Sequence, residues 1–192
     1  MPNPAPKNIR VVHSDVKQWY VAYTFPKSEK IVQTKLGKIG VASYLPMYYK
    51  TRDWSDRKKR LYVPLFPNYV FIHVESARRH ETFGVREIVR YVCFDGRPAT
   101  IKSSIIDTLQ LILSKDVPLS LDEMARPGMP VRVVQGPFAG AEGVVVRKNG
   151  NMRLIIQIEA LQSAIGVNIH TSDLMPSDSE VLALPPKCTI AR

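Results

Sequence analysis

The clearest chemistry in this sequence is that of cations, which bind phosphate groups without sequence preference. On a helical wheel of residues 28–40, the apolar Val32, Leu36 and Ile39 share one side of the predicted helix. Four lysines lie broadly opposite: Lys27, Lys30, Lys35 and Lys38. The pattern predicts a basic face on one helix, and an ordinary solvated lysine face is the alternative interpretation.

The net charge of the chain favours a polyanionic partner. The 192 residues include 27 lysines and arginines against 17 aspartates and glutamates, giving a net charge of +10 and an isoelectric point near 9.7. Residues 1–117 hold 20 basic and 10 acidic residues, whereas residues 118–192 hold seven of each. This asymmetry predicts two modules with different partners, the first of them beside nucleic acid. A basic surface without such a partner is the alternative.

Residues that usually perform catalysis show no matching pattern. The four histidines are scattered, and Cys93 and Cys188 form neither a CxxC motif nor a Cys/His cluster. No nucleophile–base pair or paired-carboxylate arrangement is evident. We therefore expect no enzymatic activity, no cofactor and no metal, with Cys93 as a small buried residue. With no apolar run of membrane-spanning length and no signal peptide, we expect a cytoplasmic protein.

Strands and helices predicted from periodicity must position these side chains. Residues 19–25 predict a strand rich in aromatic and β-branched residues, and residues 28–40 predict a helix that ends at Gly40. In residues 69–75, aromatic and histidine side chains alternate with aliphatic ones, so this strand has one aromatic and one aliphatic side. A second helix is predicted over residues 102–114.

Further strands are predicted over residues 41–50, 61–67 and 88–94, with a polar, basic loop over residues 51–60. The order of elements favours an α+β fold, an antiparallel sheet with helices on one face, over a doubly wound parallel sheet. The role of Trp54 in the basic loop is open between a stacking platform and a loop plug.

The sequence changes character after residue 126. Short alternating strands with glycine turns follow, which is typical of a small all-β barrel. We therefore predict an N-terminal tail (1–17), a first domain (18–115), a linker (116–126), a barrel domain (127–176) and a C-terminal tail (177–192).

Residues 131–145, VRVVQGPFAGAEGVV, resemble a KOW motif, the strand–turn–strand unit that opens an SH3-like barrel in NusG-type transcription factors and some ribosomal proteins. Gly136 and Gly140 suit turn conformations that other residues avoid, and Gly143 is expected to let a strand bend as the barrel closes. The GxxxGxxG spacing matches neither a P-loop nor a GxGxxG fingerprint, which excludes nucleotide binding.

Two stretches of the first domain resemble the NGN domain of the NusG family. Trp19-Tyr20-Val21 ahead of a short helix is similar to its opening, and the run LFPNYVF at residues 65–71 is similar to its PGY/PNY strand. The asparagine form resembles RfaH-like specialised paralogues. The run WSDRKK at residues 54–59, ahead of VPLFP at residues 63–67, further resembles the UpxY group of capsule-operon paralogues in Bacteroidota.

This resemblance implies an NGN-type sheet with helices followed by a KOW barrel, and an elongation or antitermination factor acting on specific operons. It implies that an aromatic patch binds the clamp helices of the largest subunit of RNA polymerase and reduces pausing. By position, Tyr23, Tyr69 and Phe71 fall on that patch. His80 and Thr82 fall where RfaH-like proteins touch the opposite jaw of the polymerase, although Glu81 stands where their triplet has threonine.

The resemblance also implies contact with the non-template DNA strand. Lys35 and Arg86 fall at the matching positions, and the predicted DNA-binding set is Lys27, Lys30, Lys35, Lys38 and Arg86. For the KOW domain it implies Rho or a small-subunit ribosomal protein as partner, although Ala160–Gly166 replaces the Phe-Gly-Arg segment of general NusG. We expect a monomer, nucleoid-associated during transcription, with no membrane contact.

Two other functions stay open at this point. A general NusG-type elongation factor would share the same domains, and it would not be confined to particular operons. A KOW-containing RNA-binding or ribosome-associated protein would bind RNA without polymerase, and the neutral charge of residues 118–192 argues against it.

Overall fold

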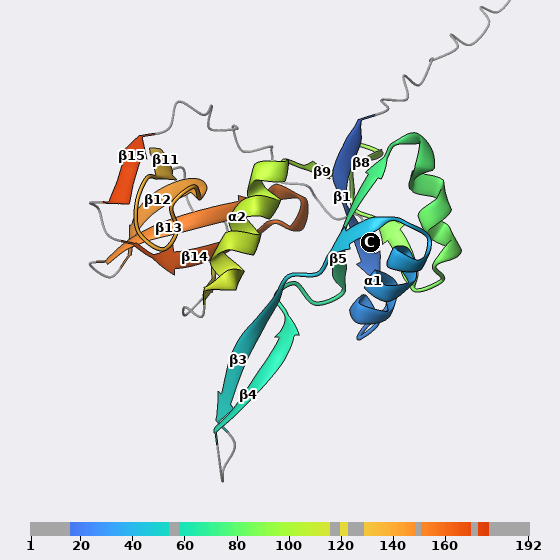
Figure 1. Ribbon diagram of the computed structural model, residues 1–192, viewed down its shortest axis with the longest axis horizontal. Helices are drawn as coiled ribbons and strands as arrows, with labels where there is room; N and C mark the ends of the chain where they lie inside the picture. Colours follow the sequence, from blue (N-terminus) through green and yellow to red (C-terminus); the bar gives the residue numbers. More distant parts are fainter. Residues whose placement is uncertain are drawn as a thin grey trace, which may run out of the picture. The chain divides into compact units, whose positions relative to one another are not determined.

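In the computed structural model, the described residues are 16–53, 58–115, 120–122, 129–148, 151–169 and 173–176. They form two compact units (Figure 1). The first unit comprises the described residues within Met1–Leu45 and Phe66–Thr100, and the second those within Pro46–Leu65 and Ile101–Arg192. An N-terminal sheet with helices and a β-rich C-terminal part confirm the predicted α+β class.

A five-stranded sheet organises the first unit. Its strands follow the order β2–β5–β1–β6, and β9 also pairs with β1. The strands are β1 (Lys17–Thr24), β2 (Ala42–Tyr44), β5 (Tyr69–Glu75), β6 (Ile88–Tyr91) and β9 (Thr100–Ile101). The other elements are helix α1 (Glu29–Lys38), the 3₁₀ helix η1 (Ala77–Gly84), and the short strands β7 (Cys93–Phe94) and β8 (Arg97–Pro98), which pair with each other. Figure 1 shows α1 and η1 on the same side of the sheet.

The β1–β5 register confirms the predicted two-sided strand. Tyr23 lies opposite Tyr69, Val21 opposite Phe71 and Trp19 opposite His73, so these side chains share one side of the sheet. The other side carries Tyr20 and Ala22 of β1 and three aliphatic residues of β5. These residues, which include Val70, Ile72 and Val74, are at most 3% exposed. That aliphatic side forms the core, and η1 packs against it through Arg79 and Thr82.

Helix α1 matches the predicted helix at both ends. Val32 and Leu36 are fully buried, whereas Lys30, Lys35 and Lys38 are exposed. The helix ends because Gly40 adopts a left-handed conformation with φ of 71°, and the Val41 N–H turns back to donate to the Leu36 carbonyl at 3.0 Å.

The predicted strand over residues 41–50 is two strands, and the predicted loop over residues 51–60 is shorter than expected. Buried Leu45 and Pro46 separate β2 from β3 (Met47–Asp53), because proline cannot continue the backbone ladder. Strand β3 pairs along its whole length with β4 (Lys58–Pro64). Trp54 lies outside the described residues, and its role stays a prediction.

Cys93 is exposed, so the prediction of a buried cysteine was wrong. It lies in β7, which is two residues long and pairs only with β8 in the described chain. A strand this short offers no second layer to cover the thiol, although Cys93 Sγ still donates to the Tyr91 carbonyl at 3.6 Å.

The second unit contains a six-stranded antiparallel sheet in the order β10–β14–β13–β12–β11–β15. These strands are β10 (Ser120–Asp122), β11 (Met129–Val133), β12 (Glu142–Lys148), β13 (Asn151–Ile158), β14 (Ser163–Asn168) and β15 (Leu174–Pro176), with a short 3₁₀ helix η2 (Glu159–Leu161) between β13 and β14. Leu154, Ile156 and Ile165 are at most 2% exposed and belong to its core.

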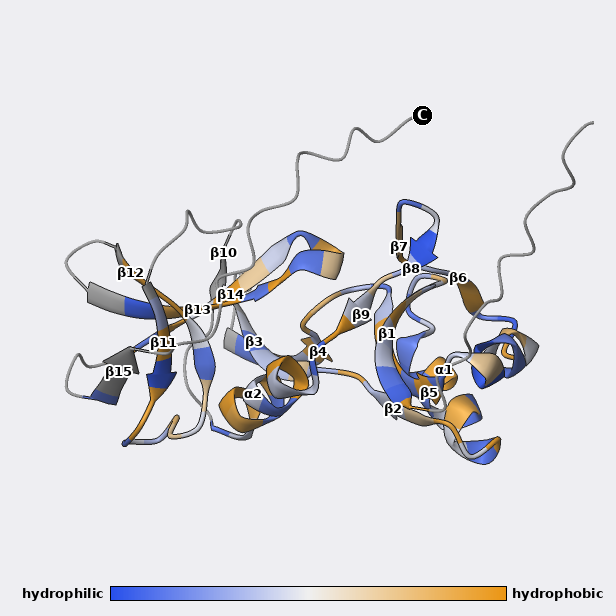
Figure 2. Ribbon diagram, turned by 90° about the horizontal axis from the view of Figure 1, so that it is seen from above, coloured by the Kyte–Doolittle hydropathy of each residue, from blue (hydrophilic) through white to orange (hydrophobic). Residues whose placement is uncertain are grey.

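Helix α2 (Ser103–Ser114) belongs to this second unit and packs on β12 and β13. The helix is strongly apolar (Figure 2), and Ile106, Leu109 and Ile112 are at most 1% exposed. The Glu142 N–H donates to Thr108 Oγ1 at 3.3 Å and fixes the start of β12 against the helix. The predicted first domain, 18–115, includes helix α2. The helix therefore packs in a different unit from the one expected, and the domain limits stay a prediction.

Close approach of two strands explains one glycine of the KOW-like motif. Gly136 and Gly140 adopt φ of 82° and 93°, as the predicted turns require. Gly143 is required for a different reason, which is lack of space for a side chain. A Cβ atom there would lie 2.6 Å from the Ile155 carbonyl oxygen and 3.0 Å from Leu154 Cδ1. The absence of a side chain at Gly143 therefore allows the backbone of β13 to approach closely.

We expect Gly143→Ala to destabilise the second unit by about 1–3 kcal/mol, because the strand backbone must shift to admit a methyl group. Gly37→Ala is the matched control, since nothing lies within 4 Å of the added carbon and alanine favours the helix by about 1 kcal/mol. Urea unfolding followed by NMR signals from each unit separates the two effects. Equal stability of the two variants would contradict the crowding argument.

Candidate functional site

The aromatic side of the first sheet carries a pair of partly exposed tyrosines. Tyr23 of β1 and Tyr69 of β5 lie directly opposite, with ring centroids 5.4 Å apart and planes at 64°. The Arg90 guanidinium of β6 lies 5.7 Å from the centroid of the Tyr23 ring. Further along the same side, Trp19 and His73 stack with centroids 4.6 Å apart. We call Tyr23, Tyr69, Trp19, His73 and Arg90 the aromatic patch.

The turn before β5 sets the position of Tyr69. Asn68 has a left-handed φ of 69°, which asparagine tolerates better than most residues. Its N–H donates to Glu29 Oε1 at 2.7 Å, and its carbonyl accepts from the Thr24 N–H at 2.8 Å. Glu29 is only 5% exposed, so this carboxylate joins the start of α1 to the turn inside the protein. The PNY sequence therefore places Tyr69 opposite Tyr23 through backbone bonds.

Two predicted polymerase-facing residues, Phe71 and Thr82, are fully buried. Phe71 packs against Tyr44 and Phe66, with ring centroids 6.3 and 6.1 Å away. Thr82 Oγ1 lies 2.7 Å from the Tyr91 hydroxyl, and burial raises the pKa of Tyr91 to about 12, so this hydroxyl stays protonated. Thr82 is buried on the aliphatic side of the sheet, whereas Phe71 is buried on the aromatic side beside Tyr44 and Phe66.

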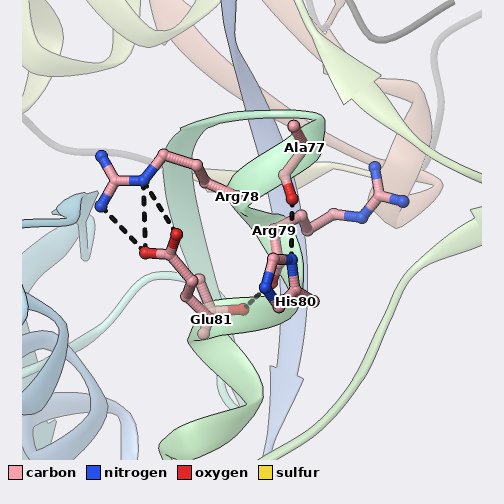
Figure 3. Close-up of polar contacts among 6 residues, drawn as sticks. Ala77, Arg78, Arg79, His80 and Glu81 are labelled. Atoms are coloured by element: carbon pink, nitrogen blue, oxygen red, sulfur yellow. Dashed lines mark hydrogen bonds and ion pairs between the residues drawn. The ribbon is translucent and has the colours of Figure 1, made fainter.

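His80 is exposed on η1, as the prediction requires. Its Nδ1 lies 2.7 Å from the Ala77 carbonyl oxygen, to which it must donate (Figure 3). The neighbouring Glu81 accepts from Arg78 at 2.9 Å, and this hydrogen bond lowers the pKa of Glu81. Glu81, which replaces the threonine of the RfaH-like triplet, is therefore paired within η1. The charge of Glu81 is thus paired with that of Arg78, and His80 is exposed beside this ion pair.

The five predicted DNA-binding residues are all exposed: Lys27, Lys30, Lys35, Lys38 and Arg86. Lys35 Nζ forms an ion pair with Glu87 Oε1 at 2.6 Å, which joins α1 to the residue next to Arg86. The hydrogen bond from Lys35 is the main cause that lowers the pKa of Glu87. The structure thus brings Lys35 into the neighbourhood of Arg86, and it pairs Lys35 with the carboxylate of the adjacent Glu87.

Sequence reasoning missed Arg90, Trp19, His73 and Glu87 as members of these surfaces. Arg90 carried no signal, because its partner Tyr23 lies far away in sequence and only the β1–β6 pairing joins them. Trp19 and His73 could have been found, since both alternate in phase with Tyr23 and Tyr69 on their strands. Glu87 could have been questioned, because it directly follows Arg86.

The described residues include no group of three or more His, Cys, Asp or Glu side chains that could hold a metal ion. Within the same residues, the helices are too short or too polar to cross a membrane. What the two surfaces offer chemically is recognition, through aromatic rings on the sheet and cations on α1.

Residues 17–110 match the family described as transcription termination factor nusG. This part of the chain is therefore similar to the NusG family, whose description names a transcription factor. A solved structure titled "Domain interaction in Thermotoga maritima NusG" is 21% identical, with a TM-score of 0.42, and the match covers 83% of this chain and 97% of that chain.

Burial predicts that Phe71 and Tyr69 differ in their effect on stability. We expect Phe71→Ala to lower the free energy of unfolding by about 3–5 kcal/mol, because it leaves a cavity in a closed core. Tyr69→Ala removes a partly exposed ring and should cost clearly less. Denaturant unfolding of the two variants tests this, and a Phe71 variant as stable as the Tyr69 variant would show that the core collapses to fill the site.

Proposed function

We propose that this protein is a NusG-like elongation or antitermination factor that binds RNA polymerase through the aromatic patch of its first unit. The observation that carries the proposal is the partly exposed Tyr23–Tyr69 pair, positioned by the bond of the Asn68 N–H to Glu29 within residues that match the NusG family. Exposed aromatic residues on a rigid sheet are the kind of anchor on which protein interfaces depend.

The proposed polymerase contact is made by the clamp helices of the largest subunit. A helix offers an apolar stripe, and Tyr23 and Tyr69 present ring area beside the cationic Arg90. His80, exposed on η1, is proposed to meet the opposite jaw of the polymerase. With Phe71 and Thr82 buried, the proposed contact set is Tyr23, Tyr69 and His80.

The proposed DNA contact is to the non-template strand beside the polymerase. Lysines on one helix give weak, salt-sensitive and sequence-independent affinity, because each phosphate contact releases about one counterion. The Lys35–Glu87 ion pair lowers this affinity further, since the carboxylate competes with phosphate for the same ammonium group. Such a surface suits a factor that contacts DNA only where polymerase has already placed it.

We further propose action on particular operons, as in the UpxY-type paralogues that residues 54–59, ahead of residues 63–67, resemble. The second unit is proposed to bind Rho or a small-subunit ribosomal protein. Within Ala160–Gly166, Gln162 is exposed, whereas Ala164, Ile165 and Gly166 are buried. A partner would therefore meet a polar residue in the segment that replaces the Phe-Gly-Arg segment of general NusG, which favours a specialised role.

The first test removes the rings of the aromatic patch. We expect Tyr23→Ala and Tyr69→Ala each to weaken binding to purified polymerase about tenfold or more, because truncating an aromatic anchor costs at least about 1.4 kcal/mol. Tyr23→Phe and Tyr69→Phe keep the rings and should bind nearly as the natural protein does. Val134→Ala, which trims a 46% exposed residue of the second unit, is the surface control. Natural affinity in the folded alanine variants would remove the patch from the interface.

The second test changes charge around Lys35. We expect the double variant Lys35→Glu and Arg86→Glu to lose antipausing activity with purified polymerase, since two phosphate contacts become repulsive. Glu87→Gln should act in the opposite direction, strengthening binding to a paused elongation complex about twofold to threefold at low salt, because it frees Lys35. Circular dichroism checks that each variant folds. Full antipausing activity in the double variant would show that these cations are ordinary surface charge.

A further inference from the structure

Strands β3 and β4 form a two-stranded ribbon that pairs with no other strand in the described chain. The pairing runs without interruption from Met47 opposite Pro64 to Asp53 opposite Lys58. The Leu65 N–H donates to the Pro46 carbonyl at 2.8 Å and closes the base of the ribbon. A free-standing ribbon of this length has two faces, and the alternation of residues decides what each face presents.

One face presents two tyrosines and a cation. Tyr49 and Tyr62 lie directly opposite, with ring centroids 4.8 Å apart and planes at 40°. The Arg60 guanidinium lies 4.7 Å from the centroid of the Tyr49 ring. Tyr49 is 57% exposed and Tyr62 is 52% exposed, more than any other tyrosine in the described residues.

Stabilising the ribbon does not require this composition. A cross-strand aromatic pair stabilises two strands by at most about 1 kcal/mol, and β-branched residues would serve as well without exposing so much ring. The opposite face shows the contrast, because Tyr48, Leu61 and Val63 are only partly exposed there. The rings of Tyr49 and Tyr62 are therefore available to a ligand.

The charge of the ribbon identifies the kind of ligand. Residues 47–64 contain six lysines and arginines against two aspartates, a marked excess of positive charge in a short segment. Among these cations, the side chains of Lys50, Lys59 and Arg60 are exposed. Aromatic rings interleaved with cations on one ribbon match a polyanion that also carries flat apolar surfaces, and a nucleic acid strand has both features.

We infer that the Tyr49–Tyr62 face of the β3–β4 ribbon binds single-stranded DNA by stacking on its bases, while Arg60 on the same face contacts its phosphates. An unpaired strand is required because the faces of bases are covered by their neighbours in a duplex. DNA is chosen because the proposed function places an unpaired DNA strand beside this protein, and the choice of DNA rests on that proposal. The ribbon is separate from helix α1, which carries the lysines proposed to contact DNA. It would add a second contact with the DNA, made by stacking.

Binding of the full chain to a fluorescent oligothymidylate of about 15 nucleotides, at low salt and without polymerase, tests the inference. We expect the double variant Tyr49→Leu and Tyr62→Leu to bind about tenfold more weakly, because leucine keeps apolar bulk and cannot stack. The double variant Tyr49→Phe and Tyr62→Phe keeps both rings and should bind as the natural chain does. Undiminished binding by the leucine variant, or an equal loss in the phenylalanine variant, would overturn the inference.

The cationic part of the site has its own matched control. We expect Arg60→Gln to weaken binding and to reduce its dependence on salt. Arg97→Gln removes the same charge from an exposed position outside the ribbon and should have a much smaller effect. Equal losses in both variants would show that net charge alone attracts the strand, which contradicts a built site.

Two further probes define the ligand. A duplex of the same length should bind more weakly than the single strand, and equal affinity for the duplex would exclude stacking. An oligouridylate that binds as tightly as, or more tightly than, oligothymidylate would overturn the assignment to DNA. The ribbon variants should keep their affinity for polymerase, so a failed polymerase contact and a failed ribbon site produce different results.

Discussion

The bond between the Glu29 carboxylate and the Asn68 N–H is the interaction on which the first unit most depends. It joins the first turn of α1 to the turn before β5, and its Glu29 carboxylate is buried, where an unmade hydrogen bond costs about 1–3 kcal/mol. The same turn bonds to Thr24 at the end of β1. One carboxylate thus sets the distance between the helix that carries the lysines and the strands that carry the tyrosines.

The two surfaces that this arrangement positions differ in how they bind. The aromatic patch is rigid, because both tyrosines stand on neighbouring strands of a five-stranded sheet. The lysines of α1 are exposed, and one of them is engaged with Glu87. A rigid apolar contact supplies affinity for one partner, whereas a weak electrostatic one responds to wherever that partner brings the DNA. The division fits a factor whose position on DNA is decided by polymerase.

Sequence patterns predicted the local structure well and the burial of individual residues less well. The alternation in residues 69–75 and the end of α1 at Gly40 follow from local geometry, and both are confirmed. Phe71 and Thr82 could not be placed by alternation, because their burial depends on Tyr44, Phe66 and Tyr91, which come from other elements. The sequence pattern predicted that Gly143 lets a strand bend. That the Ile155 carbonyl oxygen leaves no space for a Cβ atom at Gly143 is visible only in three dimensions.

Helix α2 has a consequence for how the protein can be divided. The family match extends to residue 110, and the helix it includes is seated on β12 and β13 of the second unit. A fragment cut after residue 115 would leave that side of the helix without the strands that cover it. Large bare apolar surfaces make chains self-associate, so such a fragment is prone to aggregate in the test tube. A cut before Lys102 would instead leave Ile106, Leu109 and Ile112 with the strands of their own unit.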